Sequence, residues 1–235
     1  MSRVNLPLLF VVISVNLLLL VSCRSFKTVH FSNELKTDTI LFSGELNMDS
    51  RIAGVRVLGP YTLNISGSLS NVQQKKWNAV VNEDSDRIEF MICKDGACAN
   101  AEGSYFKKTK TSSFQLFGPN SKVSRVKAEK IFGSVSYSGD TPGFEVDISK
   151  GGTGSLNLTL GLVTIRPINK KSKYGKLPYG VGLEFILDKK VIGSFIQQNE
   201  SITIVLKNEL SEKNKMILTA VAVCLMNKSN TVRII

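Results

Sequence analysis

Apolar and polar residues alternate along most of this chain, and this alternation restricts the fold more than any other feature of the sequence. Every second residue from 156 to 162 is leucine, with Asn, Thr and Gly between the leucines. The same two-residue period returns at residues 181–188 and 202–207. Because successive side chains of a strand point to opposite faces of a sheet, the pattern predicts strands with one buried face and one wet face.

Other segments have the composition of strands. Branched and aromatic residues are frequent at 40–46, 61–69, 87–93, 131–137 and 144–148. The apolar run Met216–Met226 is also interpreted as a buried strand. Helical spacing occurs over residues 72–80 and 124–130, where only a helical turn in a loop is expected. Ten or more short strands separated by turn residues predict an all-β, antiparallel sandwich or barrel.

The first 22 residues have the build of a secretory signal peptide. Arg3 supplies a positive charge, and an apolar stretch runs from Leu6 to Val21 before small residues follow. Two processing routes fit this segment. The tetrapeptide that ends in Cys23, Leu-Val-Ser-Cys, resembles a bacterial lipobox, in which cleavage after residue 22 leaves Cys23 as a lipidated N-terminus. Cleavage after Ser25 would instead remove Cys23. Both routes predict export.

The mature chain is expected to consist of an N-terminal arm at residues 23–38 and a β-sandwich domain at residues 39–235. Residues 107–127 are polar and rich in lysine, so this segment is either a linker between two small β domains or a long loop. No later segment approaches the roughly 20 apolar residues of a membrane helix.

Cys93 and Cys98 are expected to form a disulfide at the tip of a hairpin. They enclose Asp95-Gly96, the preferred pair for a two-residue hairpin turn. That turn would place the two cysteines opposite each other with Cα atoms about 4.5 Å apart, within disulfide reach. An exported protein meets an oxidising compartment, where such a bond persists. Cys224 is expected to be a buried small hydrophobe.

The residue types of common active sites are scarce. The chain has one histidine, His30, and three cysteines beyond residue 23. This composition disfavours histidine-based catalysis and zinc clusters. We therefore expect no enzymatic activity, no cofactor and no metal site.

The mature chain is basic. Without residues 1–22 it carries 29 basic and 19 acidic side chains, a net charge of +10. The densest positive cluster consists of Arg166, Lys170, Lys171, Lys173 and Lys176. On an exported protein this basic surface patch would meet an anionic glycan or lipid head groups rather than nucleic acid. The alternative interpretation is a solvated loop between two strands.

Three stretches resemble fimbrial (pilus) subunits of the chaperone-usher class. Residues Ile65–Trp77 look like an early segment of such subunits, Tyr179–Asp188 is similar to a later strand and turn, and Leu218–Cys224 resembles a late strand of small residues. The resemblance implies an incomplete immunoglobulin-like β-sandwich, completed by a strand that a neighbouring subunit donates. The donor strand of this chain would be the arm at residues 26–35, with Val29 and Phe31 at alternating positions.

Three hypotheses follow for an exported protein. The first is a fimbrial structural or adhesive subunit at the cell surface, whose partners are neighbouring subunits, a periplasmic chaperone and an usher. The second is an envelope lipoprotein, anchored to the outer membrane through Cys23, that binds a ligand or host surface receptor without catalysis. The third is a secreted, host-directed binding protein that does not polymerise. The residues expected in the core are Trp77, Phe90, Leu158, Leu160, Leu183, Phe185, Ile204, Val221 and Val223.

Overall fold

A computed structural model describes residues 31–35, 37–45, 54–76, 79–114, 121–149, 152–168, 181–198 and 201–226. Within these ranges the protein is an antiparallel all-β structure of twelve strands with one α-helix, which confirms the predicted class. The twelve strands form one continuous sheet, and the immunoglobulin-like sandwich of two facing sheets is not seen.

The bounds of the elements, in chain order, are η1 Asn33–Leu35, β1 Thr39–Glu45, β2 Gly54–Leu58, β3 Tyr61–Lys76, β4 Ala79–Lys94, β5 Ala97–Phe114, β6 Ser121–Ser136, β7 Gly143–Asp147, β8 Thr153–Leu158, β9 Gly161–Pro167, β10 Val181–Leu187, β11 Lys190–Gln198, β12 Ser201–Lys207 and α2 Glu212–Met226. Of these, η1 is a single 3-10 turn.

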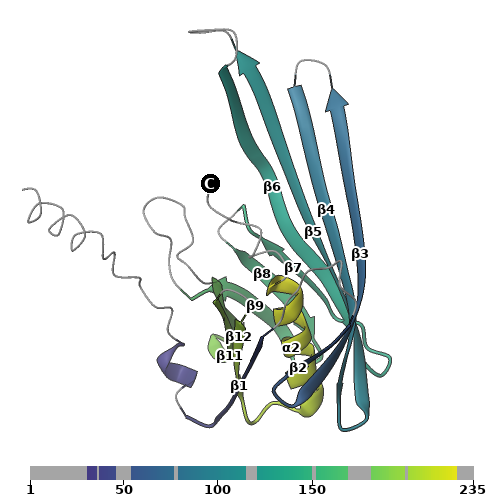
Figure 1. Cartoon of the computed structure of the whole chain (residues 1–235). Helices are drawn as coiled ribbons and strands as arrows, with labels where there is room; N and C mark the ends of the chain where they lie inside the picture. The colour runs from purple at the N-terminus through teal and green to yellow at the C-terminus, as the bar shows by residue number, and fades with distance from the viewer. Residues whose placement is uncertain are drawn as a thin grey trace, which may run out of the picture.

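The sheet curls until its two edge strands lie side by side, which gives a nearly closed, barrel-like shape (Figure 1). The strand order is β1, β12 and then each lower number down to β2. At the seam, a Cβ on Gly44 would lie 2.8 Å from the carbonyl oxygen of Val57, and one on Gly59 would overlap Phe42 at 2.4 Å. Only glycine lets β1 and β2 approach this closely.

The interior of the curved sheet is filled by α2 (Figure 1). Every residue from Asn214 to Met226 is buried, and the helix contacts β4, β5, β6, β11 and β12. The inward residues of the strands complete the core, among them Phe90, Leu183 and Phe185 as predicted. A helix that is apolar on all sides is stable only where protein surrounds it on all sides.

The prediction of a buried strand at Met216–Met226 is wrong, because these residues form the last eleven residues of α2. Ser211 starts the helix: its hydroxyl accepts a hydrogen bond from the backbone N–H of Asn214 at 3.3 Å, and its carbonyl accepts the N–H of Lys215 at 3.0 Å. Such an N-cap satisfies backbone donors that a helix start leaves open. Val221 and Val223 are buried as expected, but on a helix.

The run of alternating leucines is two strands rather than one. Leu158 pairs with Gly161 across a tight turn between β8 and β9. Leu158 points into the core, whereas Leu160 lies in the turn with 48% of its surface exposed, so its predicted place in the core is wrong. Leu162, on the far side of the turn, faces outward. Trp77, also predicted in the core, lies outside the described residues.

Strands β3 to β6 are the longest and extend beyond the rest of the sheet as a four-stranded blade (Figure 1). At about 3.3 Å per residue, a 16-residue strand is roughly 50 Å long. The segments 72–80 and 124–130, predicted as helical turns, lie in the strands of this blade wherever they are described. Residues 107–114 and 121–127, where a linker or loop was expected, are also strand residues, and all but Lys127 pair between β5 and β6.

One small cluster packs on the outer face of the sheet. Leu35 of η1 contacts Val191 and Val205, and Phe31 packs against the same cluster. The carboxylate of Glu34 accepts a hydrogen bond of 2.9 Å from the backbone N–H of Val191. The described end of the predicted donor arm therefore lies on the sheet of its own chain.

Candidate binding surface on the outer sheet face

A hollow of about 420 Å³ lies on the outer face where β5, β6, β7 and β8 run side by side. Its lining includes Phe132 and the polar side chains Glu102, Ser134, Glu145, Ser155 and Asn157. These positions point outward because their neighbours in sequence, such as Ala101, Phe144 and Leu156, point into the core. The hollow is therefore lined mainly by the solvent-facing residues of strands whose alternate residues face the core.

Strand register brings these residues together in two rows. Ser104, Phe132, Glu145 and Ser155 are successive partners across β5 to β8. In the next row Glu102 pairs with Ser134 and Ser134 with Gly143. Asn157 follows Leu156, the partner of Phe144, and so lies across from Gly143. Because Gly143 has no side chain, the second row is sunken between Ser134 and Asn157.

The carboxylates of the hollow are held by cations beside it. Glu102 forms an ion pair with Arg87 at 2.7 Å, and Arg87 also contacts Glu89 at 2.8 Å. Glu145 forms an ion pair with Lys130, and the hydrogen bond from Lys130 to Glu145 raises the pKa of that lysine. These side chains are partly exposed, so the pairs fix orientation more than they add stability.

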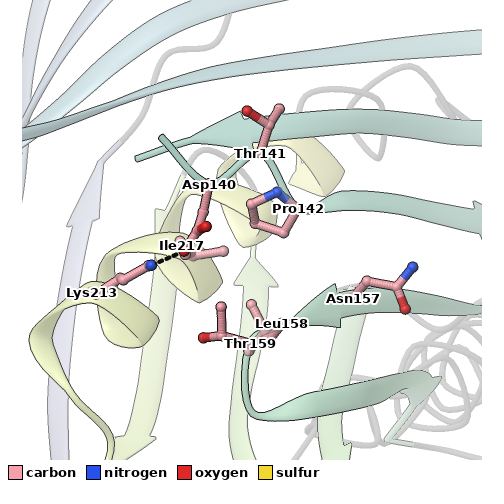
Figure 2. A pocket seen from close by; sticks show the side chains of 8 residues that line it. All are labelled: Asp140, Thr141, Pro142, Asn157, Leu158, Thr159, Lys213 and Ile217. Carbon is pink, nitrogen blue, oxygen red and sulfur yellow. Dashed lines mark hydrogen bonds and ion pairs between the residues drawn. The ribbon is translucent and has the colours of Figure 1, made fainter. Parts of the chain in front are cut away.

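A second, smaller pocket of about 250 Å³ lies at the end of the sheet beside the start of α2 (Figure 2). An ion pair between Asp140, in the turn before β7, and Lys213 of α2 crosses this pocket, whose floor includes Leu158 and Ile217. Asn157 lines both the pocket and the hollow, and in Figure 2 its amide points away from the ion pair.

The first turn of α2 is fastened to two neighbouring hairpins. Lys213 reaches Asp140, and Glu212 accepts a hydrogen bond of 2.5 Å from Lys94 at the end of β4. The hydrogen bonds from Lys94 and Lys215 lower the pKa of Glu212. An acidic residue in the first turn also interacts favourably with the helix dipole. These contacts fix the position of the helix inside the sheet.

The predicted disulfide between Cys93 and Cys98 is present and joins the end of β4 to the start of β5. The cysteines are direct partners with Cα atoms 4.2 Å apart, and Lys94 pairs with Ala97. Asp95 and Gly96 both have positive φ, as a type I′ turn requires. This element is therefore confirmed. Cys224 is buried on α2, where desolvation raises the pKa of its thiol.

The other predicted site residues are not gathered into one site. Of the basic patch only Arg166 is described: its guanidinium forms an ion pair of 3.0 Å with the largely buried carboxylate of Glu184. Lys170, Lys171, Lys173 and Lys176 lie outside the described residues, as do Cys23 and Val29. The sequence reasoning missed the hollow, because no short motif contains it: its residues come from four strands and meet only through register.

Comparisons with known proteins returned no matching family model, no matching curated protein and no matching solved structure. Among the described residues, no helix combines the length and apolar character needed to cross a membrane. The same residues contain no group of three or more His, Cys, Asp or Glu side chains placed to hold a metal ion.

Proposed function

We propose that this chain is an exported envelope protein that binds a ligand at the cell surface by contact, without catalysis. The observation that carries this proposal is the hollow on the outer sheet face, where the exposed ring of Phe132 and oriented polar side chains meet. The interior of the sheet, where many barrel-like proteins hold ligands, is filled here by α2. A ligand therefore has access to the outer face rather than to the core.

Two features support export. The leader-like segment at residues 1–22 predicts it, and the Cys93–Cys98 disulfide is the kind of bond that persists in oxidising compartments. Lipidation of Cys23 would hold the protein at the membrane, whereas cleavage after Ser25 would release it. The proposal includes both outcomes.

Protease treatment of intact cells that express the full chain tests this proposal. We expect the chain to be found outside the cytosol, either as fragments that the protease releases from intact cells or as the mature protein in the medium. Mass spectrometry of the mature protein should show a diacylated Cys23 in the first case or a free Phe26 in the second. Retention of the unprocessed chain in the cytosol, with Cys93 and Cys98 reduced, would contradict the proposal.

Open sheet edges favour a second candidate, the fimbrial subunit. Within the described residues, β3 has no strand partner on its outer side beyond Ile65, and the main chain of β6 has none on the side of β7 before Glu129. Unpaired edges can accept an extended segment of another chain through main-chain hydrogen bonds. Strand donation by residues 26–35 would use such an edge, because α2 already occupies the interior.

Electron microscopy of the purified mature chain tests the fimbrial candidate. Strand donation predicts filaments that a synthetic peptide copying residues 26–35 suppresses. A chain that stays monomeric at high concentration and is unaffected by the peptide would contradict this candidate and leave the contact-binding proposal intact.

A further inference from the structure

The hollow combines one exposed aromatic ring with hydrogen-bond donors and hydrogen-bond acceptors. From this combination we infer that the ligand is a neutral carbohydrate. The inference rests on the proposed function of an exported binding protein and names the chemical class of its ligand.

Phe132 supplies an apolar platform. Its side chain is 44% exposed and stands on β6 between Ser104 and Glu145. The face of an aromatic ring is electron-rich, so it attracts groups with positive partial charge. The C–H groups on one face of a sugar ring carry such charge, because each carbon bears an oxygen. We therefore expect the flat face of a sugar ring to stack on the exposed phenyl ring in place of water.

The surrounding groups match sugar hydroxyls. Each carboxylate has about four lone-pair sites, so Glu102 and Glu145 can still accept hydrogen bonds while paired with Arg87 and Lys130. The amide of Asn157 offers both donors and an acceptor. Hydroxyl groups donate and accept, so one sugar residue can use all these partners. The ion pairs orient the two carboxylates before binding, which reduces the entropy that is lost when a ligand binds.

The described lining of the hollow offers no unpaired cation to an anionic ligand. Its ionisable side chains are Glu102 and Glu145, and the cations beside them, Arg87 and Lys130, are already paired with these carboxylates. A sulfated, sialylated or phosphorylated ligand would bring its negative charge next to the two carboxylates. This distinguishes the hollow from the basic segment around Arg166, for which the sequence predicts an anionic glycan as the ligand.

The size and position of the hollow also fit. About 420 Å³ falls in the usual range for small-ligand sites, and the outer face is open, so one residue of a longer glycan can enter while the rest of the chain extends outside. The pocket beside α2 is smaller and is crossed by the Asp140–Lys213 ion pair, so it is the weaker candidate.

Affinity electrophoresis of the full mature chain in gels that contain soluble polysaccharides tests the inference. The neutral probes are mannan, laminarin, xyloglucan and a galactomannan, and the comparison probes are heparin and polysialic acid. We expect at least one neutral polysaccharide to retard the protein. Heparin and polysialic acid are controls: the basic chain can bind them through the segment around Arg166, so their effect should not change when the hollow is altered. Retardation by none of the four neutral probes would overturn the inference.

Two substitutions test whether the ligand binds in the hollow. Gly143→Val should fill the hollow without strain, because a Cβ at this position would lie 3.7 Å from its nearest neighbour, the carbonyl oxygen of Gly133. Phe132→Ala removes the platform. Each should weaken retardation about tenfold, the equivalent of roughly 1.4 kcal/mol. Leu162→Ala is the control, since Leu162 is 61% exposed on β9 and does not line the hollow.

Thermal unfolding of all three variants verifies that they are folded. Binding that survives both Gly143→Val and Phe132→Ala would refute the assignment of the ligand to this site. If intact cells expose the protein but no neutral glycan binds, the ligand class is wrong and the proposed function stands. If the chain never leaves the cytosol, the proposed function itself fails.

Discussion

Tyr61 is a large side chain that is buried without a hydrogen-bond partner for its hydroxyl. It stands at the start of β3 with 1% of its surface exposed. Thr219 of α2 lies nearby, but its hydroxyl donates to the carbonyl of Lys215 at 2.7 Å. Burial, together with the charge of Glu212, raises the pKa of Tyr61 to about 12. Deprotonation of this buried phenol at high pH therefore destabilises the folded state.

The substitution Tyr61→Phe tests this at the scale of one residue. A pKa that is raised in the folded state contributes stability that is complete below pH 10 and is lost as the pH rises through 12. The shift corresponds to about 2–3 kcal/mol. At pH 7 we expect the free energy of unfolding of the variant to equal or exceed that of the parent, because an unpaired buried hydroxyl is removed. Between pH 10 and 12 the variant should lose less of this free energy than the parent. Urea unfolding across this pH range measures both effects.

Among elements, the contact between β5 and α2 depends on a glycine. A Cβ on Gly103 would lie 2.9 Å from the Cβ of Cys224 and 3.1 Å from its sulfur. The helix could not lie this close to a strand that carried a side chain here. The same sheet contains Gly143, which faces outward with room for a Cβ, so the two glycines form a matched pair.

We expect Gly103→Ala to lower the free energy of unfolding by about 1–3 kcal/mol, as overpacked core positions do. Gly143→Ala should change it by less than about 0.5 kcal/mol, because substitutions at open surface positions have small effects. Chemical denaturation of both variants makes the comparison. Equal stability of the two variants would show that α2 does not pack against β5 as described.

The hairpin of β4 and β5 is cross-linked by a disulfide. Its disulfide closes a loop of six residues, from Cys93 to Cys98, for which chain entropy predicts a stabilisation of about 2 kcal/mol. We expect the double variant Cys93→Ser, Cys98→Ser to fold with a free energy of unfolding reduced by about this amount. A denaturant titration of the variant beside the oxidised parent measures it. A much larger loss would mean that the hairpin, and with it the Lys94–Glu212 contact, depends on the bond.

The alternation of residues predicted strands well where one strand has one buried face. It identified β10 and β12 and the inward positions of Phe185 and Ile204. It failed at Leu160, because a tight turn interrupts the pattern without changing its period. It also failed for α2, which is apolar on every side and so shows neither period. The start of α2 had a readable signal in Ser211, the N-cap.

The hollow could not be predicted from the sequence, for a different reason. Phe132 and Asn157 are ordinary outward residues of their strands, and only the register of three pairings places them around Gly143. The disulfide was predictable because both cysteines and the turn between them lie within six consecutive residues. Local geometry can be inferred from adjacent residues, whereas a site assembled across strands requires the fold.

For the molecule as a whole, α2 is the common centre of the core. Leu218 on this helix is fully buried among inward strand residues. Leu218→Ala should lower the free energy of unfolding by about 2–5 kcal/mol, because the transfer of a leucine to water is lost and a cavity is left. Leu162→Ala, the same change at an exposed site, should have an effect below about 0.5 kcal/mol. Thermal and urea unfolding of the pair give the two values.

The position of α2 after all twelve strands has a consequence for how the protein matures. A ribosome makes the whole sheet before it makes the helix that fills it, so the growing polypeptide exposes a large apolar concavity throughout synthesis. Folding of the core can finish only after translation has passed residue 226, so the apolar inner face of the strands stays uncovered until the last described element has been made.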